Sequence, residues 1–270
     1  MRRGSTVARL AGGVLAIALA AAAAATTPST NVFIAGDSTA AEYAPDRYPQ
    51  LGWGMVLKCA FGDDVAVHNL AQSGRSSKSF ITEGFFSRIE HEIQKGDTLL
   101  IQFGHNDEKI ADAARYTNPE TDFKVWLRRY IDTARDRGAQ PVLITPVARR
   151  KFKDGVPVDT HAPYAQAMRE LAAETHTPLI DLTADSMSWL ARLGEPASRQ
   201  YYLVFTPEQH IARFPEGHED NTHFSEMGAR QIAELIIERL SQLKLPISAR
   251  IKAERPGLTR ATPLGGPACT

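Results

Sequence analysis

The chain has 270 residues, 43% of them hydrophobic, and its 31 Lys and Arg residues balance 31 Asp and Glu residues. This length and composition allow one large hydrophobic core, and no low-complexity linker divides the chain. A nucleic-acid partner is not expected, because such proteins present a strongly basic surface. The sequence therefore predicts one main domain, which we place at residues 26–245.

The first 25 residues have the features of a signal peptide. Arginines within residues 2–9 precede an apolar stretch, residues 10–25, that ends in three alanines. A basic start, a short apolar segment and small residues at its end are typical of cleaved export signals. The alternative is a membrane anchor, but the stretch is shorter than the roughly 20 residues that span a bilayer. We expect a secreted or periplasmic protein without stable membrane association, and the export route is left open.

Five apolar runs bounded by turn residues recur along the rest of the chain. Continuous apolarity, rather than alternation, indicates strands that are covered on both faces, as in a parallel sheet. The runs are residues 31–35, 65–70, 98–103, 141–145 and 178–182.

The segments around these runs have helical patterns. They are residues 52–60, 84–95, 122–137, 162–175 and 226–242, and Ser225 is a plausible N-cap for the last one. Alternating strands and helices predict a three-layer α/β/α domain of the flavodoxin-like type with a five-stranded parallel sheet. Residues 246–270 are irregular and rich in Pro, Gly, Ala and Thr, so we expect a flexible tail outside the core.

The chain contains two cysteines, Cys59 and Cys269. An exported protein could pair them. Cys59, however, lies in an apolar segment where a buried free thiol is the simpler interpretation, and the sequence does not establish whether the two residues approach each other.

Three residues with catalytic potential follow the first three predicted strands. Ser38 comes directly after the first strand, Gly74 after the second and Asn106 after the third. Each has an ordinary explanation by itself, as a helix cap or a turn residue. The carboxyl ends of parallel strands share one sheet edge, so the three residues are expected to converge there. Acyl transfer requires a nucleophile flanked by hydrogen-bond donors for the developing oxyanion, and this set supplies both.

A nucleophilic serine also needs a base and a group that orients the base. Asp220 and His223 precede the last predicted helix and are separated by three residues, a spacing that in a turn would let the carboxylate reach one ring nitrogen. A packed or solvated histidine is the ordinary alternative. A metal site formed by His210, His218 and His223 is a further alternative, because acidic residues lie nearby.

Longer strings around these positions resemble a known superfamily. The strings, in order, are Ala35-Gly36-Asp37-Ser38-Thr39-Ala40, Asn69 to Ser77, Gln102-Phe103-Gly104-His105-Asn106-Asp107, Thr145 to Arg150 and Asp220-Asn221-Thr222-His223-Phe224-Ser225. They are similar to the motifs of the SGNH or GDSL hydrolases, and most similar to the rhamnogalacturonan acetylesterase-like branch. The resemblance implies that Ser38 is the nucleophile, His223 the base and Asp220 its orienting carboxylate. It also implies that Ser38, Gly74 and Asn106 form the oxyanion hole.

The resemblance further implies an esterase without a cofactor or metal that removes O-acetyl groups from a plant cell-wall polysaccharide, with acetylated rhamnogalacturonan the leading substrate. The alternatives are a deacetylase for xylan or another glycan, a small-ester lipase or thioesterase, and a carbohydrate-binding protein on an inactive esterase scaffold. We expect a monomer whose partner is the acetylated polysaccharide.

Basic side chains follow the second and fourth predicted strands and could bind this substrate. Arg75 follows the second strand, and Arg149 and Arg150 follow the fourth. Their positive charge would attract the carboxylates of pectin. The alternative is a solvated basic loop without a specific partner.

Overall fold

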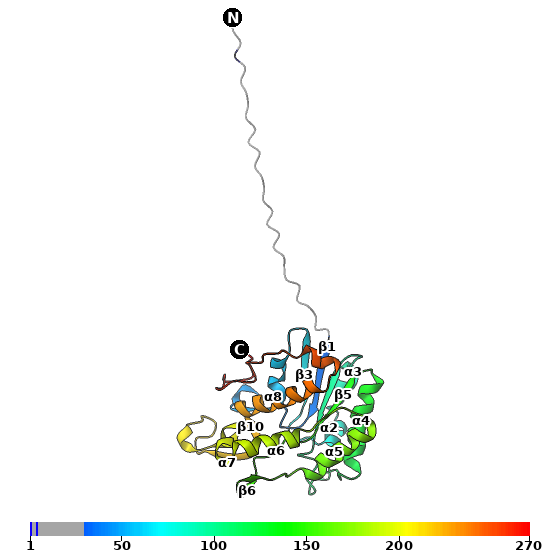
Figure 1. Ribbon diagram of the computed structural model, residues 1–270, viewed down its shortest axis with the longest axis vertical. Coiled ribbons are helices and arrows are strands. Elements are labelled where there is room, and N and C mark those ends of the chain that lie inside the picture. Colours follow the sequence, from blue (N-terminus) through cyan, green and yellow to red (C-terminus); the bar gives the residue numbers. More distant parts are fainter. Residues whose placement is uncertain (2–3, 5–29) are drawn as a thin grey trace.

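The computed structural model describes residues 1, 4 and 30–270. The predicted signal peptide, residues 1–25, therefore lies outside the described residues except for Met1 and Gly4. Residues 30–270 form a layered α/β architecture, with helices on both faces of a central sheet (Figure 1).

The central sheet has five strands in the order β3-β1-β4-β5-β8, and all neighbouring strands are parallel. The strands are β1 (Thr30–Gly36), β3 (Val65–Asn69), β4 (Thr98–Gln102), β5 (Gln140–Ile144) and β8 (Leu179–Ile180). The predicted three-layer fold with a five-stranded parallel sheet is confirmed. Each apolar run predicted as a strand contributes one strand, although the last run pairs over only two residues.

Alternate residues of β1 enter two different cores. Val32 and Ile34 pack in a buried cluster on one face of the sheet, whereas Phe33 and Ala35 pack in a second cluster on the other face. A strand whose two faces are both covered by helices must be apolar throughout, which explains its unbroken hydrophobic run. The helices are α1 (Trp53–Val56), α2 (Ser77–Thr82), α3 (Ser87–Glu92), α4 (Asp122–Asp136), α5 (Ala162–Thr175), α6 (Leu182–Leu193), α7 (Glu195–Ser198) and α8 (Glu226–Gln242).

The helices α4, α5 and α8 match their predicted ranges closely, and Ser225 caps α8 by accepting a hydrogen bond from the Gly228 N–H. The helix α6 was not predicted. Short 3-10 segments occur at Pro45–Arg47, Leu57–Ala60, Arg199–Tyr201, Pro207–Gln209 and Pro246–Arg250. In the part of the chain that the structure describes, no helix combines the length and apolarity needed to cross a membrane.

A second, antiparallel sheet was not predicted from the sequence. Its strands are β2 (Gln50–Leu51), β10 (His218–Ser225) and β9 (Tyr202–Phe205), in that order, and a separate hairpin joins β6 (Phe152–Lys153) to β7 (Val156–Pro157). The expectation that residues 220–223 form a turn is wrong, because they lie within β10. The β9–β10 register shifts between Asp220 and Phe224, which is the signature of a bulge that re-aims side chains.

The C-terminal residues are part of the folded domain, so the prediction of a flexible tail at residues 246–270 is wrong. Ile247 and Leu258 are buried, and Cys269 forms a disulfide with Cys59 across a sequence separation of 210 residues. The interpretation of Cys59 as a free thiol is therefore also wrong.

A buried ion pair in α8 organises the same segment. Glu226 and Arg230 are each 1% exposed and lie 2.8 Å apart. The Glu226 carboxylate accepts the backbone N–H groups of residues 264, 265 and 266, and the Arg230 guanidinium donates to the carbonyls of residues 257, 266 and 268. The segment is held through hydrogen bonds to its backbone groups, and an analysis of amino-acid composition does not reveal such bonds.

We predict that the Cys59→Ser/Cys269→Ser double variant loses about 2 to 4 kcal/mol of unfolding free energy, because a disulfide that closes a long loop restricts the unfolded chain. Urea unfolding of the variant, of oxidised wild type and of reduced wild type measures this. The reduced wild type should behave like the double variant. An unchanged unfolding midpoint for both would contradict the prediction.

Candidate active site

Ser38, His223 and Asp220 form a continuous chain of hydrogen bonds. Ser38 lies in the turn that follows β1, and its Oγ is 2.8 Å from Nε2 of His223. The Nδ1 atom of His223 is 2.7 Å from Oδ2 of Asp220. This is the arrangement of a serine nucleophile, a base and an orienting carboxylate.

Asp220 is held ionised by its surroundings. Its Oδ1 accepts the backbone N–H groups of Thr222 and His223 at 2.8 and 3.0 Å, while Oδ2 faces the His223 ring. Partial burial opposes ionisation, but the hydrogen bond and charge of His223, together with the backbone donors, hold the pKa of Asp220 well below its usual range. A fixed negative charge at this point orients His223 and stabilises its protonated form.

The predicted oxyanion donors lie at the ends of three neighbouring strands. Ser38, Gly74 and Asn106 follow β1, β3 and β4, which are adjacent in the sheet. The Nδ2 atom of Asn106 donates to the carbonyl of Arg75 at 3.0 Å, which fixes the amide beside the loop after β3 and leaves its second N–H available. Gly74 has a φ of +79°, a conformation that glycine adopts without strain.

Two of these donors are free. In the described part of the chain, neither the Ser38 N–H nor the Gly74 N–H donates a hydrogen bond to a protein acceptor. Tyr43 links the two loops, because its hydroxyl donates to the Ser38 carbonyl at 2.7 Å and lies 3.2 Å from Oγ of Ser73. Sequence reasoning missed Tyr43, which carries no periodic or motif signal.

A buried polar network lies beside this site and was not assigned from the sequence. Asp37 precedes Ser38 and pairs with His105 at 3.1 Å, and His105 precedes Asn106. The ring of His161 contacts the ring of His105 with centroids 4.2 Å apart. Both histidines are nearly inaccessible to solvent. The sequence signals were the presence of Asp37 in the string around Ser38 and of His105 in the string around Asn106.

The same network continues to the loop that carries the histidine base. His161 lies 2.9 Å from Glu108, and Glu108 pairs with Arg149 at 2.6 Å. Arg149 in turn donates through Nε to the Thr222 hydroxyl at 3.1 Å. Residues adjacent to Ser38, Asn106 and His223 are therefore joined through buried and half-buried polar contacts.

Arg150 does not face solvent, which does not favour substrate binding, and its predicted role there stays a prediction. It is 6% exposed, and its guanidinium donates to Oγ of Ser198, Oδ1 of Asn221 and the carbonyl of Glu195 at 2.8 to 2.9 Å. The Arg150 N–H also donates to the Asn221 carbonyl at 2.8 Å. Arg150 thus holds the residue that follows Asp220.

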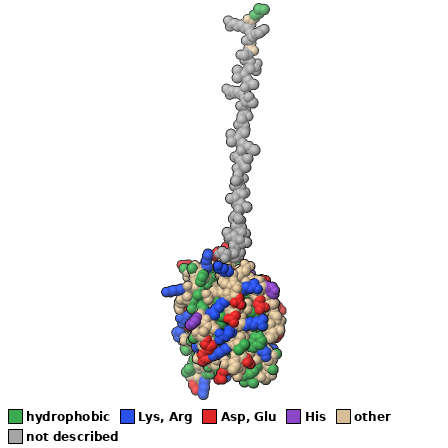
Figure 2. All heavy atoms as spheres, turned by 90° about the vertical axis from the view of Figure 1, so that its right-hand side faces the viewer, with side chains coloured by type: hydrophobic (Ala, Val, Ile, Leu, Met, Phe, Trp, Pro, Cys, Tyr) green, Lys and Arg blue, Asp and Glu red, His purple; other side chains and the backbone are tan. Residues whose placement is uncertain are grey.

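Arg149 and Arg75 each have a carboxylate partner. Arg149 pairs with Glu108, and Arg75 binds Glu83 through both Nε and Nη2 at 3.0 and 2.7 Å. Neither presents an unpaired positive charge, and their role in substrate binding stays a prediction. Lys, Arg, Asp and Glu side chains are interspersed on the face seen in Figure 2, which shows no broad field of one sign.

The histidines proposed as a metal cluster do not converge. Within the described residues, no group of three or more His, Cys, Asp or Glu side chains is placed to hold a metal ion. His218 stacks on Phe214 with ring centroids 4.1 Å apart, and both ring nitrogens of His223 face Asp220 and Ser38. His210, His218 and His223 therefore do not form such a group among the described residues.

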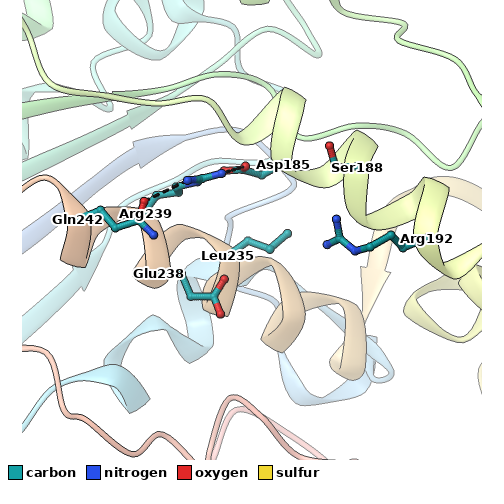
Figure 3. Close-up of a pocket in the computed structure, with 7 residues that line it drawn as sticks. All are labelled: Asp185, Ser188, Arg192, Leu235, Glu238, Arg239 and Gln242. Carbon is teal, nitrogen blue, oxygen red and sulfur yellow. Dashed lines mark hydrogen bonds and ion pairs between the residues drawn. The ribbon is translucent and has the colours of Figure 1, made fainter.

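A groove of about 300 Å³ between α6 and α8 shares no residue with this site. Figure 3 shows that Arg239 reaches across it to Asp185, and the two side chains are 2.5 Å apart. Arg192 lies at the other end of the groove (Figure 3). Because the Arg239 charge is already paired, the groove offers no comparable reactive set.

We predict that His161 makes the protein less stable in acid. Burial lowers the pKa of His161 to about 4, whereas the unfolded chain binds a proton as the pH falls below 6.5. The unfolded state then binds more protons, so the unfolding free energy decreases between pH 6.5 and 4 by about 3 kcal/mol from this residue. Urea unfolding at both pH values should show a smaller decrease for His161→Asn, whose amide N–H can replace the ring donor to Glu108. Equal decreases would contradict the prediction.

Comparisons with known proteins agree with this geometry. Residues 34–231 match the GDSL-like lipase/acylhydrolase family. The chain is 42% identical over 217 residues to the rhamnogalacturonan acetylesterase RhgT of Bacillus subtilis, which covers 80% of this chain and 91% of the relative. It is 37% identical over 227 residues to the probable rhamnogalacturonan acetylesterase YesY of the same organism, covering 84% and 100%.

Solved structures have the same fold. The protein YxiM of Bacillus subtilis has a TM-score of 0.68 at 25% identity, over 82% of this chain and 58% of that one. A catalytic mutant of the acetylxylan esterase Axe2 from Geobacillus stearothermophilus has a TM-score of 0.53 at 17% identity, over 80% and 96%. With the family match spanning most of the chain, this protein belongs to the GDSL-like lipase/acylhydrolase family and is a carboxylic ester hydrolase.

Proposed function

We propose that this ester hydrolase removes O-acetyl groups from a plant cell-wall polysaccharide, most specifically from acetylated rhamnogalacturonan. The observation that carries the chemistry is the hydrogen-bonded chain from Ser38 through His223 to Asp220 at the edge of the parallel sheet. The substrate class is supported by the names of the two relatives that share 42% and 37% of aligned residues with this chain.

In the proposed mechanism, Ser38 Oγ attacks the acetyl carbonyl carbon while His223 Nε2 accepts the serine proton. The carbonyl oxygen becomes an oxyanion that receives hydrogen bonds from the N–H groups of Ser38 and Gly74 and from the Asn106 amide. Collapse of this intermediate breaks the ester bond, and His223 donates its proton to the departing sugar oxygen, which becomes a hydroxyl. An acetyl-serine remains.

In the second half of the cycle, water replaces the serine as the nucleophile and Ser38 Oγ becomes the leaving group. His223 takes a proton from the water as it attacks the acetyl-serine, and then protonates Ser38 Oγ as acetate leaves. Asp220 stays ionised throughout and stabilises the positive charge on His223. No cofactor enters this scheme.

Export is part of the proposal. The polymer substrate lies outside cells, and the chain begins with residues that have the pattern of a signal peptide. The Cys59–Cys269 disulfide supports an oxidising environment, since such bonds persist mainly in exported proteins. Acetylated xylan and short-chain acetate esters are the alternative substrates that an assay must compare.

We predict that Ser38→Ala abolishes acetate release while the protein stays folded, because among the described residues the Ser38 hydroxyl hydrogen-bonds only to the His223 ring. Asn106→Ala should lower kcat by about a hundredfold or more, the typical loss of one oxyanion donor. Acetate release from acetylated rhamnogalacturonan, acetylated xylan and a small acetate ester measures both effects, with circular dichroism as the folding control. Turnover by Ser38→Ala would refute the mechanism, and a faster rate on xylan would refute the substrate.

We predict that Arg150→Met lowers kcat about tenfold or more with little change in KM. The variant loses the side-chain hydrogen bond to Asn221 and the two that anchor Arg150 itself to Ser198 and Glu195, and it thereby loosens and displaces the segment that carries Asp220 and His223. The displacement should also alter the pH dependence of kcat by weakening the Asp220–His223 contact. Arg137→Met, at an exposed position, is the matched control. A change confined to KM would instead assign Arg150 to substrate binding.

A further inference from the structure

A second cavity adjoins the serine loop. Its volume is about 220 Å³, and its lining includes Tyr43, Tyr48, Leu51, Met55 and residues 265–267. Tyr43 connects it to the active site, because the same side chain that lines the cavity donates its hydroxyl proton to the Ser38 carbonyl. A ligand in this cavity would therefore contact a residue that is hydrogen-bonded to the serine loop.

The walls of the cavity are fixed in place. The Tyr48 hydroxyl donates to Glu226 at 3.2 Å, and the same carboxylate holds the backbone N–H groups of residues 264–266. The Cys59–Cys269 disulfide anchors the chain just beyond this wall. A preformed cavity binds its ligand without the cost of ordering loops.

Two arginines lie at the edge of the cavity. Arg47 donates to Gln50, a lining residue, at 3.4 Å, and Arg213 donates to the Arg47 carbonyl at 2.6 Å. Neither makes an ion pair with a carboxylate among the residues that the structure describes. Burial and the nearby Arg47 charge lower the pKa of Arg213, while Asp46 and Tyr43 act in the opposite direction. Arg213 thus contacts the backbone of Arg47, whose own guanidinium contacts the cavity lining at Gln50.

This combination matches an acidic sugar. The apolar C–H face of a pyranose ring can pack against the face of a tyrosine ring. The sugar hydroxyls then stay exposed to water. A carboxylate on the same sugar would bind a guanidinium through paired, charge-assisted hydrogen bonds. A neutral sugar would leave both arginines without a carboxylate partner.

We propose that Tyr43, Tyr48, Arg47 and Arg213 form a subsite for a uronate unit of the glycan, adjacent to the acetylated sugar. The subsite rests on the proposed glycan deacetylation. It assigns carboxylate recognition to the cavity lined by Tyr43 and not to Arg149 and Arg150, whose guanidinium groups bind other side chains of the protein. The C-terminal segment is then one wall of the substrate site.

The test compares Arg47→Gln and Arg213→Gln with Arg192→Gln. Arg192 lies in the distant α6–α8 groove, so its substitution removes the same charge without touching the cavity (Figure 3). We expect the ratio of kcat/KM on acetylated rhamnogalacturonan oligosaccharide to kcat/KM on a small acetate ester to fall about tenfold for each edge variant, through KM. The Arg192→Gln ratio should equal that of wild type. An unchanged ratio in both edge variants would overturn the subsite.

A second pair of variants tests the cavity itself. A Cβ atom added at Gly266 meets no atom within 4 Å, so Gly266→Phe can place a ring at the cavity wall without a clash at Cβ. Ala261→Phe adds the same ring at an exposed position outside the lining. Gly266→Phe should raise KM for the oligosaccharide about tenfold relative to Ala261→Phe. Equal KM values would overturn the assignment.

A binding measurement distinguishes failure of the uronate subsite from failure of the proposed deacetylase function. Calorimetry of Ser38→Ala with unacetylated rhamnogalacturonan oligosaccharide should show binding that Arg47→Gln weakens and that salt screens. If wild type released no acetate from any glycan, the proposed function would fail. If wild type were active on the polymer but this oligosaccharide bound equally well with and without Arg47, the subsite alone would fail.

Discussion

The nucleophile and its base belong to different sheets, and the 2.8 Å contact between Ser38 and His223 depends on how those sheets are joined. Ser38 lies in the turn that follows β1 of the parallel sheet, whereas His223 lies in β10 of the antiparallel sheet. The pairing of β10 with β9 is interrupted after Asp220, so residues 221–223 gain their support from elsewhere. Arg149 and Arg150 provide it by binding Thr222 and Asn221.

The residues that support the catalytic loops are polar because they lie at the carboxyl ends of the strands. The carboxyl ends of the strands leave backbone groups that no strand partner satisfies, and buried side chains must meet them. Asp37, His105, His161 and Glu108 connect these ends in a run of short contacts beneath the reacting groups. Removing one member would leave another buried polar group unpaired, which costs more than the lost hydrogen bond itself.

The five strands of the parallel sheet and the long helices α4, α5 and α8 were predictable, because each has a strong local pattern of apolar residues. The candidate site was predictable because its residues stand in recognisable strings; they are Ser38, Gly74, Asn106, Asp220 and His223. Strand β10 was not, since His218 to His223 are polar and the strand is formed by pairing with distant segments. The attachment of residues 257–269 was hidden for a similar reason, because buried Glu226 and Arg230 bind backbone groups that no sequence pattern reveals. The burial of Arg150 likewise reflects long-range contacts alone.

The central claim is that Ser38 is the residue that becomes acylated and that His223 activates it. The most direct measurement is the site and rate of labelling by a serine-directed organophosphate, determined by mass spectrometry of peptides from wild type and from His223→Ala. The account predicts a single adduct on Ser38 in wild type and labelling slowed by at least about a hundredfold in the variant. An adduct on another serine, or equal rates in the two proteins, would contradict it.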